Sequence, residues 1–284
     1  IGLAALQTVL EEGNKDDWFG SEFIVRLTII AAVSLTLFLI IELRTAHPLA
    51  GSERDIRLHR DPCTDERTDP IFYGRDLIGQ IQRCATPQEI GCHSFSHADF
   101  ATCSRARADA ELAACVKAAQ SMGVRPRSFV FPRNRVGHLD LLPKHGFTVF
   151  RGPDPTWHES ASVRGWQHRA GHLLDVTRAA QPPVVEAEWN AAGLWDVKGS
   201  MLYTPSYGFR QHIPVSLRVL RAKKGLQQAV AQRRIFHLWF HPTDVVIRQR
   251  EMLDGLRQIF EAAQELRQTR RLEILPMAQV PNYC

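Results

Sequence analysis

The stretch Glu89–Phe100, EIGCHSFSHADF, places a short apolar run directly before two histidines that are four residues apart. These residues, His93 and His97, would point both rings to one side of a turn or of a helix start. Neutral imidazoles are common nitrogen ligands of Zn²⁺. The spacing alone is a weak signal, because H-x-x-x-H is frequent by chance and an isolated pair is more often hydrogen-bonded or exposed than metal-bound.

Around this motif, from residue 61 onward, short apolar runs alternate with amphipathic stretches, which is the pattern of a parallel sheet with crossover helices. Strands are predicted at 89–92, 128–132, 147–152, 235–240 and 272–277. Helices are predicted at 74–84, 104–122, 139–144 and 245–268, and residues 157–208 form a long irregular insertion. In the second helix Ser104 is the expected N-cap and Gly123 the expected terminator. In (β/α) barrels, which are built from such alternating strands and helices, catalytic residues collect at the carboxyl ends of the strands. Both His93 and His241 follow predicted strands and so fall at these ends.

Composition and charge argue against three classes of protein: intrinsically disordered, nucleic-acid-binding and disulfide-scaffolded. The chain has 284 residues, of which 44% are hydrophobic and 23% charged, so it is expected to fold around a substantial core. Its net charge of +5 is spread over 35 basic and 30 acidic residues, and no nucleic-acid motif accompanies it. The six cysteines include no C-x-x-C pair, which favours a reducing compartment over a disulfide scaffold.

Residues 1–58 differ in character from the rest. The stretch Phe23–Leu43 is apolar apart from a few positions and carries charges only at Arg26 and Glu42. At about 1.5 Å per residue it is long enough to cross a bilayer, with a buried core helix as the alternative. Basic residues follow it, at Arg44, Arg54, Arg57 and Arg60. The positive-inside rule then predicts a membrane-associated chain with residues 59–284 in the cytoplasm, and without a genuine span the chain would be cytoplasmic.

The same segment carries a first resemblance. IGLAALQTVLEEGNKDDWFGS, the apolar span and ELRTAHPL together are similar to one transmembrane helix with its flanks from the fourteen-helix drug:proton antiporter branch of the major facilitator superfamily. Such transporters build their pathway between two bundles of helices, which one span cannot supply. We therefore expect residues 1–58 to be a truncated or fused fragment and not a working transporter.

A second resemblance covers residues 60–278, which are similar to polysaccharide deacetylases with the NodB homology domain, of the carbohydrate esterase family 4 type. It rests on HSFSH at 93–97, FVFPRN at 129–134 and LWFHP at 238–242. The first motif resembles the family's H-[ST]-x-x-H metal motif, which implies His93 and His97 as ligands of a divalent metal, with Zn²⁺ as the first candidate. The third motif resembles L-x-x-H, which implies His241 as the general acid and Leu238 as a wall of the acetyl pocket. The second, a divergent groove motif, implies three substrate-binding residues: Pro132, Arg133 and Asn134.

The resemblance implies a metal-dependent hydrolase that removes N- or O-acetyl groups from an acetylated polysaccharide or amino sugar. Family members also carry a T-F-D-D-G-like motif on the first strand, which supplies the base and the third metal ligand, and this chain has no such motif. Residues 59–284 are therefore expected to form an incomplete (β/α) barrel that lacks its first strand. Loss of the base removes roughly 10²- to 10⁴-fold in rate, so we expect feeble activity. The alternative is a non-catalytic, membrane-tethered carbohydrate-binding domain.

A purely structural role remains an alternative for three residues in or near these motifs. Arg133 could be a surface salt-bridge partner, and Trp239 is more typical of a core residue than of a substrate platform. His237 shares a strand face with His241 but is favoured as a core histidine over a catalytic one.

Overall fold

The computed structural model describes residues 74–155, 173–206 and 208–283, together with 65, 67, 68 and 171. All of them belong to one compact unit, Thr64–Cys284. The predicted membrane-spanning stretch at 23–43 and the predicted boundary after residue 58 lie outside the described residues. Across the part of the chain that is described, no helix has both the length and the apolar character that a bilayer span requires.

Parallel strands form the frame of this unit. Strands β1 (Ser128–Val130), β2 (Val149–Arg151) and β4 (Trp195–Val197) lie side by side in that order, and β3 (Ala187–Trp189) pairs antiparallel with the outer edge of β4. A second parallel pair joins β5 (Met201–Leu202) to β6 (Leu238–Trp239). A single parallel bridge from Cys92 to Phe129 places the segment before His93 beside β1. The predicted mixed α/β class with parallel strands is confirmed, whereas the (β/α) barrel stays a prediction.

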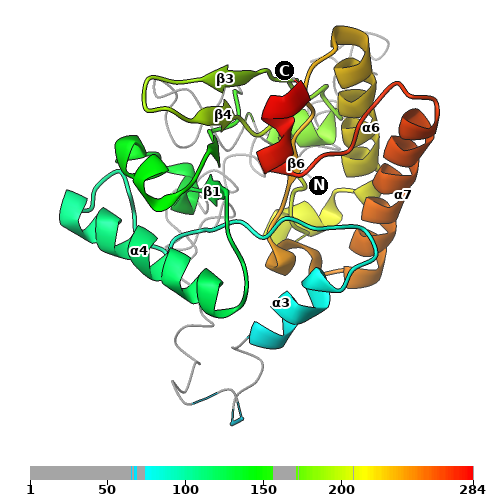
Figure 1. Cartoon of the computed structure of the whole chain (residues 1–284). Coiled ribbons are helices and arrows are strands. Elements are labelled where there is room, and N and C mark those ends of the chain that lie inside the picture. Colours follow the sequence, from blue (N-terminus) through cyan, green and yellow to red (C-terminus); the bar gives the residue numbers. More distant parts are fainter. Residues whose placement is uncertain are drawn as a thin grey trace, which may run out of the picture. The chain divides into compact units, whose positions relative to one another are not determined.

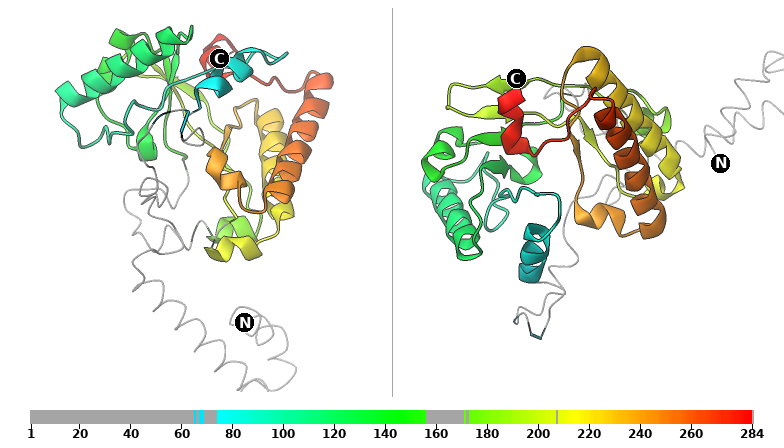
Figure 2. Two further views of the ribbon diagram at one scale, coloured as in Figure 1. Left: turned by 90° about the horizontal axis from the view of Figure 1, so that it is seen from below. Right: turned by 45° about the vertical axis from the view of Figure 1, so that its right-hand side comes forward.

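The helices flank these strands on two sides (Figure 1). Helix α4 (Arg105–Ser121) lies on one side, and α6 (Val215–Gln232) and α7 (Gln249–Gln268) lie next to each other on the other side. Figure 2 shows the same separation from two further directions. The shorter α3 spans Arg75–Gln82. As predicted, the Ser104 hydroxyl caps α4 by accepting from the Arg107 amide at 3.3 Å, and Gly123 follows the helix at φ +71°.

Short 3₁₀ turns make most of the connections, at η3 Pro132–Asn134, η4 Leu139–Leu141, η5 Pro143–His145, η7 Gly208–His212, η8 Pro242–Val245 and η9 Met277–Tyr283. The helix predicted at 139–144 is thus two separate turns. Pro143 has no N–H to donate to the preceding turn and begins the second one, which ends at Gly146 with φ +88°.

An aromatic core packs between α4 and the first strands. Phe129 on β1 and Phe150 on β2 are register partners, so their rings share one face of the sheet. Edge-to-face contacts link the cluster, with ring centroids 4.9 Å apart for Phe129 and Phe131 and 5.3 Å for Phe100 and Phe129. Because side chains alternate along a strand, Arg151 then faces the opposite side of the sheet from Phe150.

A second core lies under α6 and α7. Met201, Tyr203 and the inward faces of the two helices form it, and the Tyr203 hydroxyl donates to the Met252 carbonyl at 3.0 Å. The polar centre of this region is Arg218, which is 1% exposed and donates to the carbonyls of Thr204, Pro205, Arg210 and Ile213. The guanidinium therefore ties α6 to the loop that follows β5.

Several predicted elements need correction. No strand forms at 272–277; this segment is irregular, and Pro276, which cannot donate to a ladder, precedes η9. The last helix begins at Gln249 instead of 245, because η8 occupies residues 242–245, and the apolar side chains of Leu253 and Phe260 on this helix are exposed. Helix α6 was not predicted, since its inward face includes Arg218, Arg221 and Gly225 and so hides the apolar period.

Candidate active site

His93 lies at the carboxyl end of the segment that bridges to β1. Its Nδ1 is 2.8 Å from the Val130 carbonyl oxygen. Because a carbonyl oxygen can only accept, this bond requires the proton on Nδ1 and leaves the lone pair on Nε2. Burial lowers the pKa of His93, and the charges of His97, Arg151 and His241 add to this effect against the opposing Val130 hydrogen bond. The lowered pKa favours the neutral form of this exposed ring, which is the form that can ligate a metal.

His97 faces His93 across a tight turn. The two ring centroids are 5.1 Å apart and the ring planes meet at 68°. The turn begins and ends in left-handed backbone, with φ of 63° at Ser94 and 57° at His97. This conformation is unfavourable for residues other than glycine, so surrounding contacts must hold it.

His241 follows β6 and is held by a carboxylate three residues further on. Its Nδ1 is 3.1 Å from Oδ2 of Asp244, and the same oxygen accepts from the His241 amide at 2.8 Å. Asp244 thus fixes the ring through Nδ1 and directs Nε2 away from the carboxylate. Its ring packs edge-to-face against Trp239, with ring centroids 5.8 Å apart, and its charge is among the causes that lower the pKa of His93.

Arg151 and Asp154, which the sequence did not single out, complete this region together with Trp239. Arg151, at the end of β2, places its guanidinium carbon 4.1 Å from the centroid of Trp239, and its Nη2 donates to Oδ1 of Asn134 at 2.6 Å. Trp239 Nε1 lies 3.0 Å from each carboxylate oxygen of the buried Asp154. Arg151 lies near the end of the strand predicted at 147–152, and Asp154 follows that strand. The rule that catalytic residues collect at the carboxyl ends of strands could therefore have indicated both.

The four remaining predicted residues differ in their surroundings. Pro132 is buried, Arg133 is exposed at φ 56°, and Asn134 contacts Arg151 as described. Leu238 packs against the core under α6 and α7, on the other side of β6 from Trp239. Asn134 is therefore the substrate-binding candidate that the structure brings to the Arg151 region, and an acetyl-pocket role for Leu238 stays a prediction.

His237 has the surroundings of a core histidine. Its Nδ1 is 3.2 Å from the Lys198 carbonyl oxygen, and its own amide donates to the Ser200 hydroxyl at 3.1 Å. Burial, assisted by the charge of Arg151, lowers its pKa to about 4. The ring is neutral at pH 7 and is bound to backbone, in agreement with the interpretation that the sequence favoured.

The histidines meet part of what a divalent metal needs. His93 offers Nε2, and its Nδ1 hydrogen bond to a carbonyl is the kind of outer contact that orients metal-ligating histidines. Within the described residues, however, no group of three or more His, Cys, Asp or Glu side chains is arranged to hold an ion. The donor set thus fits two ligands of a site that normally needs three from the protein.

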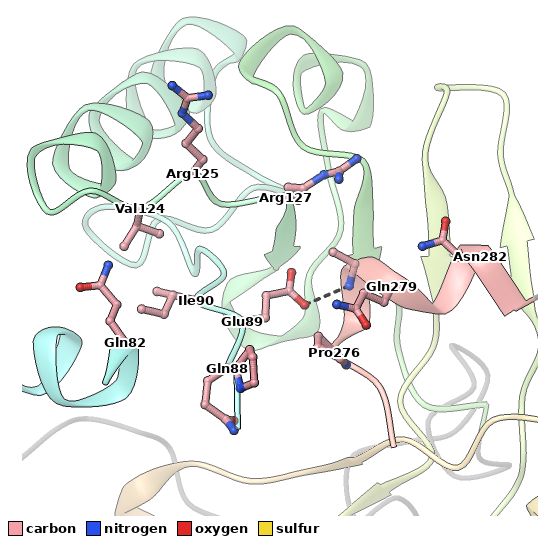
Figure 3. Close-up of a pocket in the computed structure, with 12 residues that line it drawn as sticks. Gln82, Gln88, Glu89, Ile90, Val124, Arg125, Arg127, Pro276, Gln279 and Asn282 are labelled. Atoms are coloured by element: carbon pink, nitrogen blue, oxygen red, sulfur yellow. Dashed lines mark hydrogen bonds between the residues drawn. The ribbon is translucent and has the colours of Figure 1, made fainter. Parts of the chain in front are cut away.

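A cavity of about 360 Å³ lies at the opposite, amino-terminal ends of the strands (Figure 3). Its walls come from the segments before Cys92 and β1 and from η9, and they include Gln82, Glu89, Ile90, Arg127 and Gln279. Glu89 Oε2 accepts from the Ala278 amide at 2.9 Å, which is the contact dashed in Figure 3. Among the described residues that line it, none is a predicted site residue, so this cavity is separate from the histidine cluster.

Comparisons with known proteins add no relative. No family model matches the chain, and no curated protein matches it.

Proposed function

We propose that this unit is a divalent-metal-dependent hydrolase of the polysaccharide deacetylase type, acting on the N- or O-acetyl groups of an acetylated carbohydrate. The observation that carries the proposal is the His93–His97 pair, whose ring centroids are 5.1 Å apart, together with His241, which follows β6 and is held through Nδ1 by Asp244. An imidazole pair beside a third, carboxylate-bound imidazole is a sensible combination of ligand and proton donor.

In this proposal His93 and His97 hold the metal through their imidazole nitrogens. A bound divalent ion would polarise an acetyl carbonyl and lower the pKa of a water molecule. His241 donates a proton from Nε2 to the departing amine or alcohol, while the Asp244 carboxylate at 3.1 Å stabilises the protonated ring. Arg151, buried and stacked on Trp239, favours the neutral form of His93 by its positive charge.

The proposal includes weak turnover in this chain. Two imidazoles bind a divalent ion less tightly than three protein ligands do. No paired aspartates of the T-F-D-D-G type are present to serve as base, so the rate falls by about 10²- to 10⁴-fold. Slow but metal-dependent acetate release is therefore the expected behaviour.

The test combines zinc titration by calorimetry with acetate release from acetylated amino-sugar oligomers. His241→Ala is expected to keep zinc binding and to lower the zinc-dependent rate by about 10²-fold, because only the proton donor is lost. His93→Ala is expected to lose both zinc binding and activity. His145→Ala is the matched control, since that imidazole pairs with Asp109 at 2.8 Å and lies outside the cluster. Acetate release that is unchanged in His241→Ala would overturn the assignment.

One observation favours a second function, a non-catalytic carbohydrate-binding domain. The described residues provide no third ligand beside His93 and His97. Oligosaccharide binding without zinc-dependent acetate release, in the same titrations, would support this alternative and exclude the hydrolase.

A further inference from the structure

The turn between the two histidines is organised from helix α4. Glu111 lies on the inward face of α4 and is 8% exposed. Its Oε2 accepts from the amides of Phe95 at 3.0 Å and Ser96 at 2.7 Å, and from the Ser94 hydroxyl at 3.3 Å. Its Oε1 accepts from the Ser96 hydroxyl. One carboxylate thus receives hydrogen bonds from all three residues between His93 and His97.

These bonds explain how an unfavourable turn persists. Left-handed backbone at Ser94 and His97 is unfavourable for residues other than glycine, so neighbouring contacts must stabilise it. Bonds to an ionised acceptor are about twice as strong as neutral ones, and here four of them converge on one group. Ser94 also accepts from the Ala98 amide at 3.1 Å, which links the turn to the segment that follows it.

The protonation state agrees with this role. Burial by itself raises the pKa of Glu111, but hydrogen bonds from Ser96, Phe95 and Ser94 outweigh burial and leave the pKa below its ordinary value. The carboxylate is therefore charged at neutral pH and acts only as an acceptor toward the turn.

We propose that Glu111 is the positioning residue of the histidine pair: its carboxylate holds residues 94–96 in the turn that brings the His93 and His97 rings within 5.1 Å of each other. Among the described residues, the hydrogen bonds of the Glu111 side chain go to the turn between the rings, so Glu111 acts through the two histidines. The inference rests on the proposed metal site for its functional consequence, but the ring geometry can be measured without any metal.

The test uses Glu111→Gln, which preserves shape and removes the charge. The matched control is Asp109→Asn on the same helix, whose carboxylate is exposed and pairs with His145. In the metal-free protein, Glu111→Gln is expected to accelerate amide hydrogen exchange at Phe95 and Ser96 by about 10- to 100-fold and to abolish the nuclear Overhauser contact between the two rings. Amides in the middle of α4 should keep their protection in both variants, which reports that the domain is folded.

Zinc titration supplies the functional readout. Glu111→Gln is expected to weaken zinc binding by about 10- to 100-fold, as the loss of an orienting contact commonly does, while Asp109→Asn leaves binding unchanged. If wild type binds no zinc, the metal proposal fails and the exchange and ring measurements still decide the role of Glu111. Exchange rates at Phe95 and Ser96 and a ring contact that all survive in Glu111→Gln would overturn the inference.

A milder variant covers the case in which Glu111→Gln does not fold. Ser96→Ala removes one hydroxyl donor at an exposed position and leaves both amide bonds in place. It is expected to accelerate exchange at Phe95 and Ser96 by about 3- to 10-fold and to be tolerated by the fold. No change at these amides in Ser96→Ala would also count against Glu111.

Discussion

The carboxyl and amino ends of the parallel strands carry different kinds of side chain. At the carboxyl end, the His93 and His97 rings pair at 5.1 Å, and Trp239 contacts both the Arg151 guanidinium and the His241 ring. At the amino end, the cavity near Glu89 is lined largely by amide and apolar side chains. His93 and the cavity lie at the two ends of the same segment around Cys92, so the difference comes from the loops and the side chains that each end brings together.

The carboxyl end shows how charged groups can be concentrated without free movement. Each one is fixed by a specific partner: His93 by the Val130 carbonyl, Arg151 by Trp239, and His241 by Asp244. Preorganised groups of this kind are what catalytic sites require, and they make this end sensitive to single substitutions. The amino end, where the Glu89 carboxylate accepts from the Ala278 amide, should be more tolerant.

The largest loss of stability is expected from substitution of Arg218. Arg218→Ala leaves the carbonyls of the loop after β5 without their buried donors, and we expect it to lower the free energy of unfolding by about 3–5 kcal/mol. Urea denaturation measures this loss. The control is Arg257→Ala on the exposed face of α7, where a change below about 0.5 kcal/mol is expected. Similar losses in the two variants would mean that burial of Arg218 contributes little.

The next largest effect is a pH-dependent contribution of His237 to the free energy of unfolding. Its pKa is about 4 when folded and near 6.5 when unfolded, so between these values the unfolded chain binds more protons. This residue's contribution is therefore complete above about pH 6.5 and falls by about 3 kcal/mol as the pH drops to about 4. Denaturation of wild type and His237→Gln across this range should show a difference that depends on pH. Parallel profiles would contradict the burial of a neutral ring.

The histidine pair tests whether the carboxyl end is a ligand site. His97→Ala removes one of the two imidazoles and is expected to weaken zinc binding by about 100-fold, or about 2.7 kcal/mol. Calorimetric titration checks this value. His138→Ala is a suitable control, since that ring bonds to the Cys103 carbonyl at 2.9 Å, and its zinc affinity should equal that of wild type.

The smallest effect is expected at the amino end. Glu89→Gln keeps a carbonyl oxygen to accept from the Ala278 amide, so the free energy of unfolding should change by less than about 1 kcal/mol. Zinc affinity should be unaffected, because the cavity is separate from the histidines. A marked loss of zinc binding in this variant would show that the cavity and the histidines are coupled.

Sequence reasoning succeeded where structure depends on nearby residues. Ser104 and Gly123 marked the limits of α4, and apolar runs marked β1 and β2, because capping and strand alternation are local effects. It failed for α6, where Arg218 occupies an inward position and breaks the apolar pattern. It also predicted a strand at 272–277 from an apolar run that packs as irregular chain against η9 and its neighbours.

For the candidate site, the sequence by itself determined the ligand-capable side chains: His93 and His97 in one motif and His241 after a later strand. Asp244, three residues after His241, is a local cap of that ring, whereas only the tertiary structure brought Glu111 on α4 to the turn between His93 and His97 and Arg151 on β2 to Trp239. A buried charged residue is stable only if its partners are brought to it, and those partners lie on segments that no local pattern connects.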